Sequence, residues 1–166
     1  IHYVLLGGSL FTIFAGFYYW FPKMTGRMYN ETLGKVHFWT TFIAFNATFF
    51  PMHIIGVQGQ PRRVYTYEDQ FGNWNFAISI AAFVLGASFI LFIYNMVVSW
   101  ARGPRAPANP WRANTLEWQV SSPPPTFNFD EIPQVVGNPY EYGVPGAQHA
   151  SLNGAREKVT ETATEE

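Results

Sequence analysis

The sequence predicts an all-α membrane protein in which three transmembrane helices precede a polar tail rich in proline and glycine. Three stretches without Lys, Arg, Asp or Glu predict the helices: residues 1–22, 36–61 and 70–101. A spanning helix needs about 20 mostly apolar residues, and each stretch is at least that long. The tail is predicted because no further apolar stretch follows and three prolines stand in a row at 123–125.

The composition restricts the chemistry that the chain can perform. It has 166 residues, a net charge of −1 and no cysteine. Disulfides, thiolate metal sites, cysteine nucleophiles and iron–sulfur clusters are therefore excluded, and any metal must be bound by histidine, carboxylate or a cofactor. No basic stripe is present that would indicate a nucleic acid as partner. The apolar stretches indicate membrane lipid instead.

The first helix is expected over about residues 3–21. Four aromatic residues at 18–21 form an interface belt, and Pro22 and Lys23 predict that the helix stops there. The chain begins with Ile1 and no basic region precedes the apolar run, so this segment does not resemble a secretion signal. We expect the natural polypeptide to continue before Ile1, or the chain to be one piece of a split subunit.

The second helix is expected over about residues 36–55 and the third over about 76–100. Pro51 should kink the second helix, because proline removes a backbone hydrogen bond and its ring crowds the preceding turn. Asn95 is the most polar residue inside the third helix.

Positive charges orient the predicted bundle. Lys23, Arg27 and Lys35 lie between the first two helices, and further arginines follow the third. Two crossings separate these segments, so they share one side of the membrane, which the positive-inside rule makes cytoplasmic or matrix. The C-terminal tail is predicted on that side, whereas His2 and the loop at 56–75 face the outer side.

Three domains follow from these patterns. Residues 1–100 form the three-helix transmembrane segment. Residues 101–131 are expected to be an extended proline-rich segment that docks on another surface through its aromatic side chains. Residues 132–166 form a polar C-terminal tail whose acidic end is expected to be disordered.

Few side chains in the spans can perform chemistry. His2 lies at the start of an apolar helix, and a neutral imidazole is a good axial ligand for heme iron. The alternative is an interfacial histidine that is hydrogen-bonded to water or lipid. His37 and His53 are expected to be hydrogen-bonded structural residues.

The adjacent pair Arg62 and Arg63 suits two carboxylates near the membrane surface, because a guanidinium group stays charged and can grip a carboxylate with two donors. A heme has two propionates, and the predicted topology puts His2 on the same side as this pair. The alternative is a solvated turn in which the arginines pair with Glu68 and Asp69.

Several segments in order carry a resemblance to a known family: residues 1–5 (IHYVL), 20–22 (WFP), 35–38 (KVHF), 48–53 (TFFPMH), 59–63 (GQPRR) and 114–118 (NTLEW) before the three prolines. Over about residues 1–129 the chain resembles the C-terminal quarter of heme–copper oxidase subunit I, the catalytic subunit of cytochrome c oxidase. The resemblance implies that the three spans are the last three of a twelve-helix bundle.

The resemblance also implies roles for individual residues. His2 matches an axial ligand of the low-spin heme, a heme a, and Arg62 and Arg63 match a pair that binds heme propionates. Ile1 and Leu5 would lie between this heme and the oxygen-binding heme. The copper ligands, the other low-spin ligand and the ligand of the oxygen-binding heme would lie in the N-terminal part of subunit I. The chain would then contain no catalytic residue and be inactive alone.

The resemblance implies an oxidoreductase and translocase whose partners include the rest of subunit I and other oxidase subunits. The low-spin heme would pass electrons from cytochrome c to the heme–copper oxygen-reduction centre, coupled to proton pumping. The location would be the bacterial plasma membrane, which we favour, or the mitochondrial inner membrane. A quinol-fed oxidase subunit I and a non-redox membrane scaffold or transporter bundle stay open as alternatives.

Overall fold

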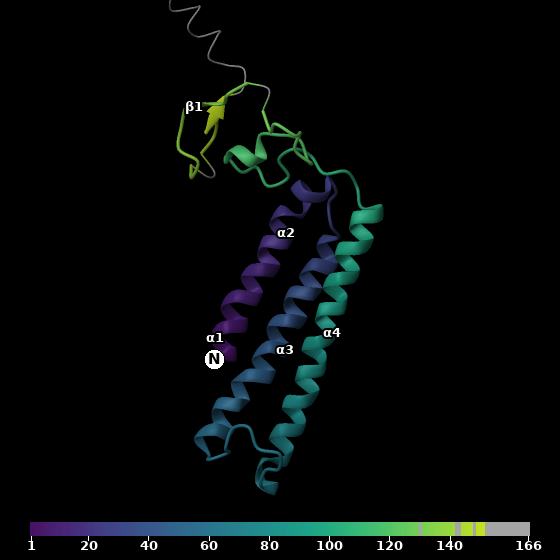
Figure 1. The fold of residues 1–166 in the computed structure, drawn as a ribbon, viewed down its shortest axis with the longest axis vertical. Coiled ribbons are helices and arrows are strands. Elements are labelled where there is room, and N and C mark those ends of the chain that lie inside the picture. Colours follow the sequence, from purple (N-terminus) through teal and green to yellow (C-terminus); the bar gives the residue numbers. More distant parts are fainter. Residues whose placement is uncertain (130, 142–143, 148, 152–166) are drawn as a thin grey trace, which may run out of the picture. The chain divides into compact units, whose positions relative to one another are not determined.

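The computed structural model describes residues 1–129, 131–141, 144–147 and 149–151. These residues form two compact units (Figure 1). One unit comprises Ile1–Phe21 and Met28–Pro104 and contains most of the helical structure. The other comprises Pro22–Arg27 and the chain from Arg105 onward. Three helices are long and apolar enough to cross a membrane, so the predicted three-span architecture is confirmed.

The first span consists of three consecutive helical segments. The α-helix α1 (His2–Leu5) passes into a π-helical segment, η1 (Leu6–Leu10), and then into α2 (Phe11–Thr25). The predicted stop at Pro22 is wrong, because α2 continues through this residue. Gly26 ends the helix: its N–H donates to the Pro22 carbonyl at 2.8 Å, and its φ of +70° favours glycine.

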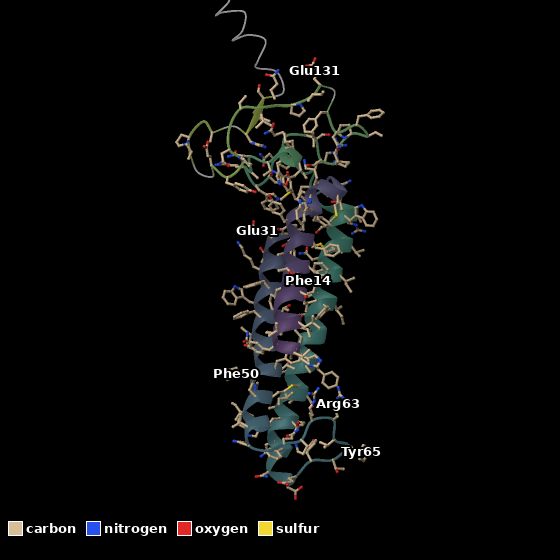
Figure 2. All side chains as sticks on the ribbon, turned by 60° about the vertical axis from the view of Figure 1, so that its left-hand side comes forward. Phe14, Glu31, Phe50, Arg63, Tyr65 and Glu131 are labelled. Atoms are coloured by element: carbon tan, nitrogen blue, oxygen red, sulfur yellow. The ribbon has the colours of Figure 1, made fainter. Side chains whose placement is uncertain are left out.

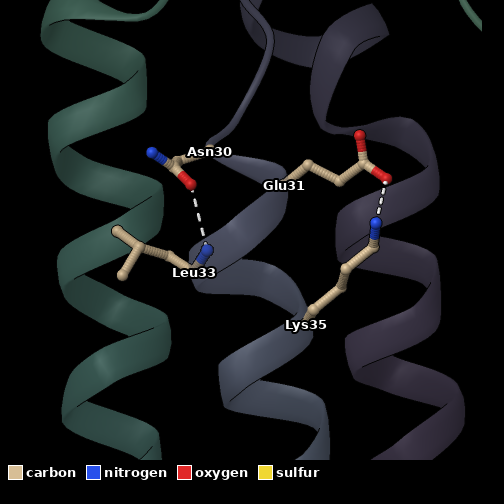
Figure 3. A network of polar contacts seen from close by, with 4 residues as sticks. All are labelled: Asn30, Glu31, Leu33 and Lys35. Carbon is tan, nitrogen blue, oxygen red and sulfur yellow. Dashed lines mark hydrogen bonds and ion pairs between the residues drawn. The ribbon is translucent and has the colours of Figure 1, made fainter.

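The second span, α3 (Glu31–Val57), begins five residues before the predicted start. Asn30 is its N-cap, and the Asn30 side chain accepts a hydrogen bond of 3.0 Å from the N–H of Leu33 (Figure 3). Glu31 and Lys35 form an exposed ion pair of 2.9 Å one turn apart. The helix continues as one element across Pro51, and the kink expected there stays a prediction.

The third span, α4 (Gly72–Arg102), follows a single 3-10 turn, η2 (Asp69–Phe71). It runs beside α3 (Figure 1). Ala44 and Phe45 of α3 pack against Leu85 of α4 in a buried apolar cluster.

Polar side chains add hydrogen bonds between α4 and the segment around α3. The hydroxyl of Thr41 donates to Ser88 at 2.9 Å inside the helix pair. The side chain of Asn95 is fully buried. It donates a hydrogen bond to the backbone carbonyl of Asn30 at 3.1 Å and accepts one from the backbone N–H of Asn30 at 3.2 Å. A buried amide satisfied in this way fixes the register of the two segments.

The second unit contains little regular structure among its described residues. It has a 3-10 turn, η3 (Leu116–Trp118), and a strand pair in which β1 (Gln134–Val135) runs antiparallel to β2 (Ala150–Ser151). The expectation of no further spanning helix is met within the described part of the chain. The strand pair was not predicted. The disorder expected for the acidic end of the tail, residues 156–166, lies outside the described residues.

Lys23 organises the second unit. Its side chain is buried, and its ammonium group donates to the carbonyls of Ala108 at 3.0 Å, Val120 at 2.8 Å and Ser121 at 3.3 Å. The ammonium also lies 5.0 Å from the centre of the Trp118 ring. These contacts connect the last turn of α2 to three points of the irregular chain.

Candidate functional site

His2 lies in the first turn of the first span, in α1, which contacts α3. Its side chain is exposed in this chain. The imidazole stacks on the Phe49 ring of α3, with the ring centres 5.7 Å apart and the planes within 4° of parallel. This is an offset stack of the kind that aromatic pairs prefer.

Tyr3 ties the same turn to α3 on the side of Asn46. The Tyr3 hydroxyl donates a hydrogen bond to the side-chain oxygen of Asn46. The side-chain NH2 group of Asn46 donates to the backbone carbonyl of Phe42 at 2.8 Å. The Tyr3 ring meets the His53 ring edge-on at 5.5 Å. The start of α1 is therefore held against α3 by both polar and ring contacts.

The other two histidines of the spans are placed as structural residues. His53 Nδ1 lies 3.1 Å from the Phe49 carbonyl and 3.2 Å from the Phe50 carbonyl, so this nitrogen carries the proton. His37 is buried, and its Nδ1 is 3.1 Å from the Tyr18 hydroxyl. Both were expected to be hydrogen-bonded, and both are.

The loop after α3 is anchored at Gln60. Gly59 has a φ of +102°, and the Gln60 N–H donates to the Ile55 carbonyl at 3.0 Å, which completes a Schellman motif. The Gln60 side chain pairs with Asn75 of α4 through two amide hydrogen bonds, of 2.9 and 3.3 Å. Pro61, whose ring fixes φ, then leads directly to the arginine pair.

Arg62 and Arg63 are exposed, and Arg63 has a φ of +60°. Neither forms an ion pair with a carboxylate in the part of the chain that the structure describes. The expected alternative, a turn in which they pair with Glu68 and Asp69, therefore finds no support. Figure 2 shows Arg63 and Tyr65 in the half of the helical unit that is remote from Glu31.

A cavity of about 430 Å³ is lined by Ile1, His2, Arg62 and Arg63. The structure thus brings together three of the predicted site residues, His2, Arg62 and Arg63, although about 60 positions separate the histidine from the arginines in the sequence. Leu5, the fourth, does not line this cavity, although its side chain is 57% exposed. A second cavity of about 180 Å³ borders His2 on the side of Phe49 and His53.

This arrangement offers one imidazole and two guanidinium groups to a single ligand. An imidazole supplies a lone pair to a metal, and guanidinium groups bind carboxylates through paired donors. In the described residues, no three His, Cys, Asp or Glu side chains gather in a way that could hold a metal ion. A metal bound at His2 therefore needs ligands from a cofactor or from another polypeptide segment.

Comparison with known proteins decides the family. The family described as cytochrome c and quinol oxidase polypeptide I matches residues 1–84, about half of the chain. The chain belongs to this oxidase family. Because three of its helices are long and apolar enough to span a membrane, it is an integral membrane protein. The resemblance found in the sequence motifs is therefore confirmed.

Individual members of the oxidase family are similar over most of this chain. Cytochrome c oxidase subunit 1 of Synechocystis sp. is 52% identical over 143 residues, which are 86% of this chain and 26% of that protein. The subunit of Thermostichus vulcanus is 49% identical over 90% of this chain and 27% of its own length. That of Cereibacter sphaeroides is 46% identical over 80% of this chain. The chain thus spans about a quarter of the length of these relatives.

Two features of the site were missed by sequence reasoning. The stack of Phe49 on His2 joins residues 47 positions apart, and Phe49 is one of many aromatic residues in its helix. The Gln60–Asn75 pair joins two polar residues that flank the loop. The positions of Gln60 and Asn75 could have indicated this pair, because each residue adjoins an apolar stretch and polar side chains at facing helix ends can pair.

Proposed function

We propose that this chain is the part of an oxidase subunit I that helps bind a low-spin heme a. His2 supplies an axial ligand to the iron, and Arg62 and Arg63 bind the propionates. The observation that carries the proposal is the cavity of about 430 Å³ that His2 and both arginines line. Leu5 contributes apolar surface near the heme, as the family resemblance implies.

His2 can act as an axial ligand because its ring nitrogens have no hydrogen-bond partner among the described residues and its side chain is exposed. The neutral imidazole needs to lose no proton before it binds iron. A heme supplies one-electron chemistry when bound. The second axial ligand would come from the N-terminal part of subunit I.

Arg62 and Arg63 stabilise negative charge at the edge of the same cavity. Each guanidinium stays protonated and can donate two parallel hydrogen bonds to one carboxylate. The residues just before the pair are held by the Schellman motif and by the Gln60–Asn75 pair, so the chain enters the arginine pair from a fixed point.

In the complete complex, the low-spin heme would receive electrons from cytochrome c and pass them to the oxygen-binding heme and copper. Those two cofactors would be shared with the rest of subunit I, and the transfer would be coupled to proton translocation. The names of the relatives, cytochrome c oxidase subunit 1, support cytochrome c as donor. The complex would lie in a bacterial plasma membrane or a mitochondrial inner membrane, with other oxidase subunits and lipid around it.

The second candidate is a quinol-fed oxidase. The family description covers both cytochrome c and quinol oxidases, and the residues that line the cavity are suited to either. Heme identification separates the two: heme a supports the cytochrome c oxidase, whereas heme b or o as the low-spin heme supports the quinol-fed relative.

The axial ligand is tested by His2→Ala in the assembled oxidase, with a reduced-minus-oxidised visible spectrum as the measurement. We expect the low-spin heme band to be lost and oxygen consumption to fall at least tenfold, because one of two axial bonds disappears. His53→Ala is the matched control. It removes a nearby exposed histidine whose Nδ1 faces backbone carbonyls, and it should leave the band unchanged. A normal low-spin band in His2→Ala would refute the proposal.

A further inference from the structure

Among the described residues, an aromatic ring of α3 lies parallel to the His2 imidazole. Neither ring nitrogen forms a hydrogen bond with another described residue, and the ring contact found for His2 there is the stack on Phe49. The planes differ by 4°, so the direction of the Phe49 ring also defines the direction of the imidazole plane. An axial histidine usually has its ring fixed by a hydrogen bond to its second nitrogen. A parallel aromatic ring is a second way in which an imidazole ring can be fixed.

Phe49 is itself held in place. Its ring packs on Phe45 at 5.2 Å, and Phe45 is only 4% exposed. Phe45 belongs to the buried cluster with Ala44 and Leu85, against which Phe49 is partly buried. These contacts on one side of the Phe49 ring favour the rotamer in which the ring lies against Phe45. A continuous set of apolar contacts therefore leads from the α3–α4 core to His2.

We propose that Phe49 is a positioning residue that sets the plane of the His2 imidazole relative to the heme. This inference rests on the proposed function, in which His2 is an axial ligand. The bond between iron and an imidazole nitrogen allows the ring to rotate, so contacts around the ring decide its direction. That direction determines which iron d orbitals the imidazole π electrons meet, and it thereby affects the electronic structure of the heme.

The stack also explains why a flat side chain is present at this position. A parallel aromatic ring favours one imidazole plane over tilted ones, whereas an aliphatic side chain of similar volume offers no planar surface. Phe50, the next residue, serves as the internal comparison. It is 57% exposed and its ring meets His53 at 6.1 Å, with no ring contact to His2 among the described residues.

The test compares Phe49→Leu, Phe49→Tyr and Phe50→Leu in the assembled oxidase by electron paramagnetic resonance of the oxidised low-spin heme. The g-values of a low-spin ferric heme report the orientation of its axial imidazole planes. We expect shifted or broadened g-values in Phe49→Leu, with the low-spin heme content unchanged. Phe49→Tyr keeps the aromatic ring and should show the wild-type g-values. Phe50→Leu should show the wild-type g-values as well.

The outcomes separate the inference from the function on which it rests. Wild-type g-values in Phe49→Leu, with full low-spin heme content, would overturn the role of Phe49 and leave the role of His2 intact. Absence of a low-spin heme from the wild-type complex would overturn both. If Phe49→Leu does not assemble, Phe49→Met replaces it in the test, because methionine is flexible and lacks a planar face. Shifted or broadened g-values are again expected, and wild-type g-values would again overturn the role of Phe49.

Discussion

Arg62 and Arg63 show how a local backbone arrangement places two cations at the cavity that His2 also lines. They follow a motif that ends α3, and their neighbour Gln60 is tied to α4 by two amide hydrogen bonds. Their guanidinium groups border the cavity at His2 without a carboxylate partner among the described residues. Two cations left side by side repel each other, so a ligand with two negative groups stabilises the loop.

We predict that Arg62→Gln lowers the midpoint potential of the low-spin heme and leaves the heme bound. A positive charge near the heme destabilises the oxidised form more than the reduced form, so its removal favours the oxidised form. At an effective dielectric constant of about 20, one charge roughly 10 Å away shifts the potential by tens of millivolts. A potentiometric titration of the assembled oxidase measures this shift.

The control for Arg62→Gln is Arg102→Gln, which removes the same charge from the last residue of α4, remote from the cavity. Its potential should equal that of the wild-type oxidase. A potential that is unchanged in Arg62→Gln would count against propionate binding by this residue.

Sequence reasoning singled out His2 and the arginine pair because an imidazole can ligate heme iron and guanidinium groups bind carboxylates, and the family resemblance implied both roles. It could not predict what surrounds them. The partner of His2 is Phe49, one of 16 phenylalanines in the chain, and nothing in the local pattern distinguishes it from its neighbours. Contacts of this kind are decided by the packing of one helix on another, which a single sequence does not specify.

At the scale of elements, charge-free stretches predicted the helices but not their ends. The second helix begins at Glu31 because Asn30 caps it and because Glu31 pairs with Lys35, so a charged first turn is stable. The first span passes Pro22 and ends at Gly26, where a positive φ is available. A proline near the last turn removes one backbone bond, and the other bonds of that turn still form.

Lys23, which was assigned to a loop, is the buried residue that connects the end of α2 to the irregular chain. We predict that Lys23→Met destabilises the segment at 105–129, because three backbone carbonyls lose their charged donor. Hydrogen bonds to charged groups contribute about 1.5 to 3 kcal/mol, and the loss should be of that order. Limited proteolysis of the assembled oxidase, followed by mass spectrometry, measures it.

Lys35→Met is the matched control for this prediction. Lys35 forms an ion pair with Glu31, but its side chain is 70% exposed, and exposed pairs contribute between about 0 and 1 kcal/mol. Its proteolysis rate should stay close to that of the wild type. Equal protection of the segment in Lys23→Met and in the wild type would refute the anchoring role of Lys23.

At the scale of the whole molecule, the helices leave much apolar surface uncovered. The chain spans about a quarter of the length of its relatives, and many large apolar side chains of its helices are exposed, among them Phe83 and Ile90 at 80% and 70%. Lipid or further helices must cover such surface. The docking of the proline-rich segment at 101–131 and the side of the membrane on which it lies stay predictions.

We propose that one heme is held by both His2 and the arginine pair. A structure of the assembled oxidase that contains this chain, determined at a resolution that shows side chains, tests it most directly. We predict that the iron of the low-spin heme is bonded to a ring nitrogen of His2 and that its propionates lie against Arg62 and Arg63. A low-spin heme whose two axial ligands both come from other segments would contradict it.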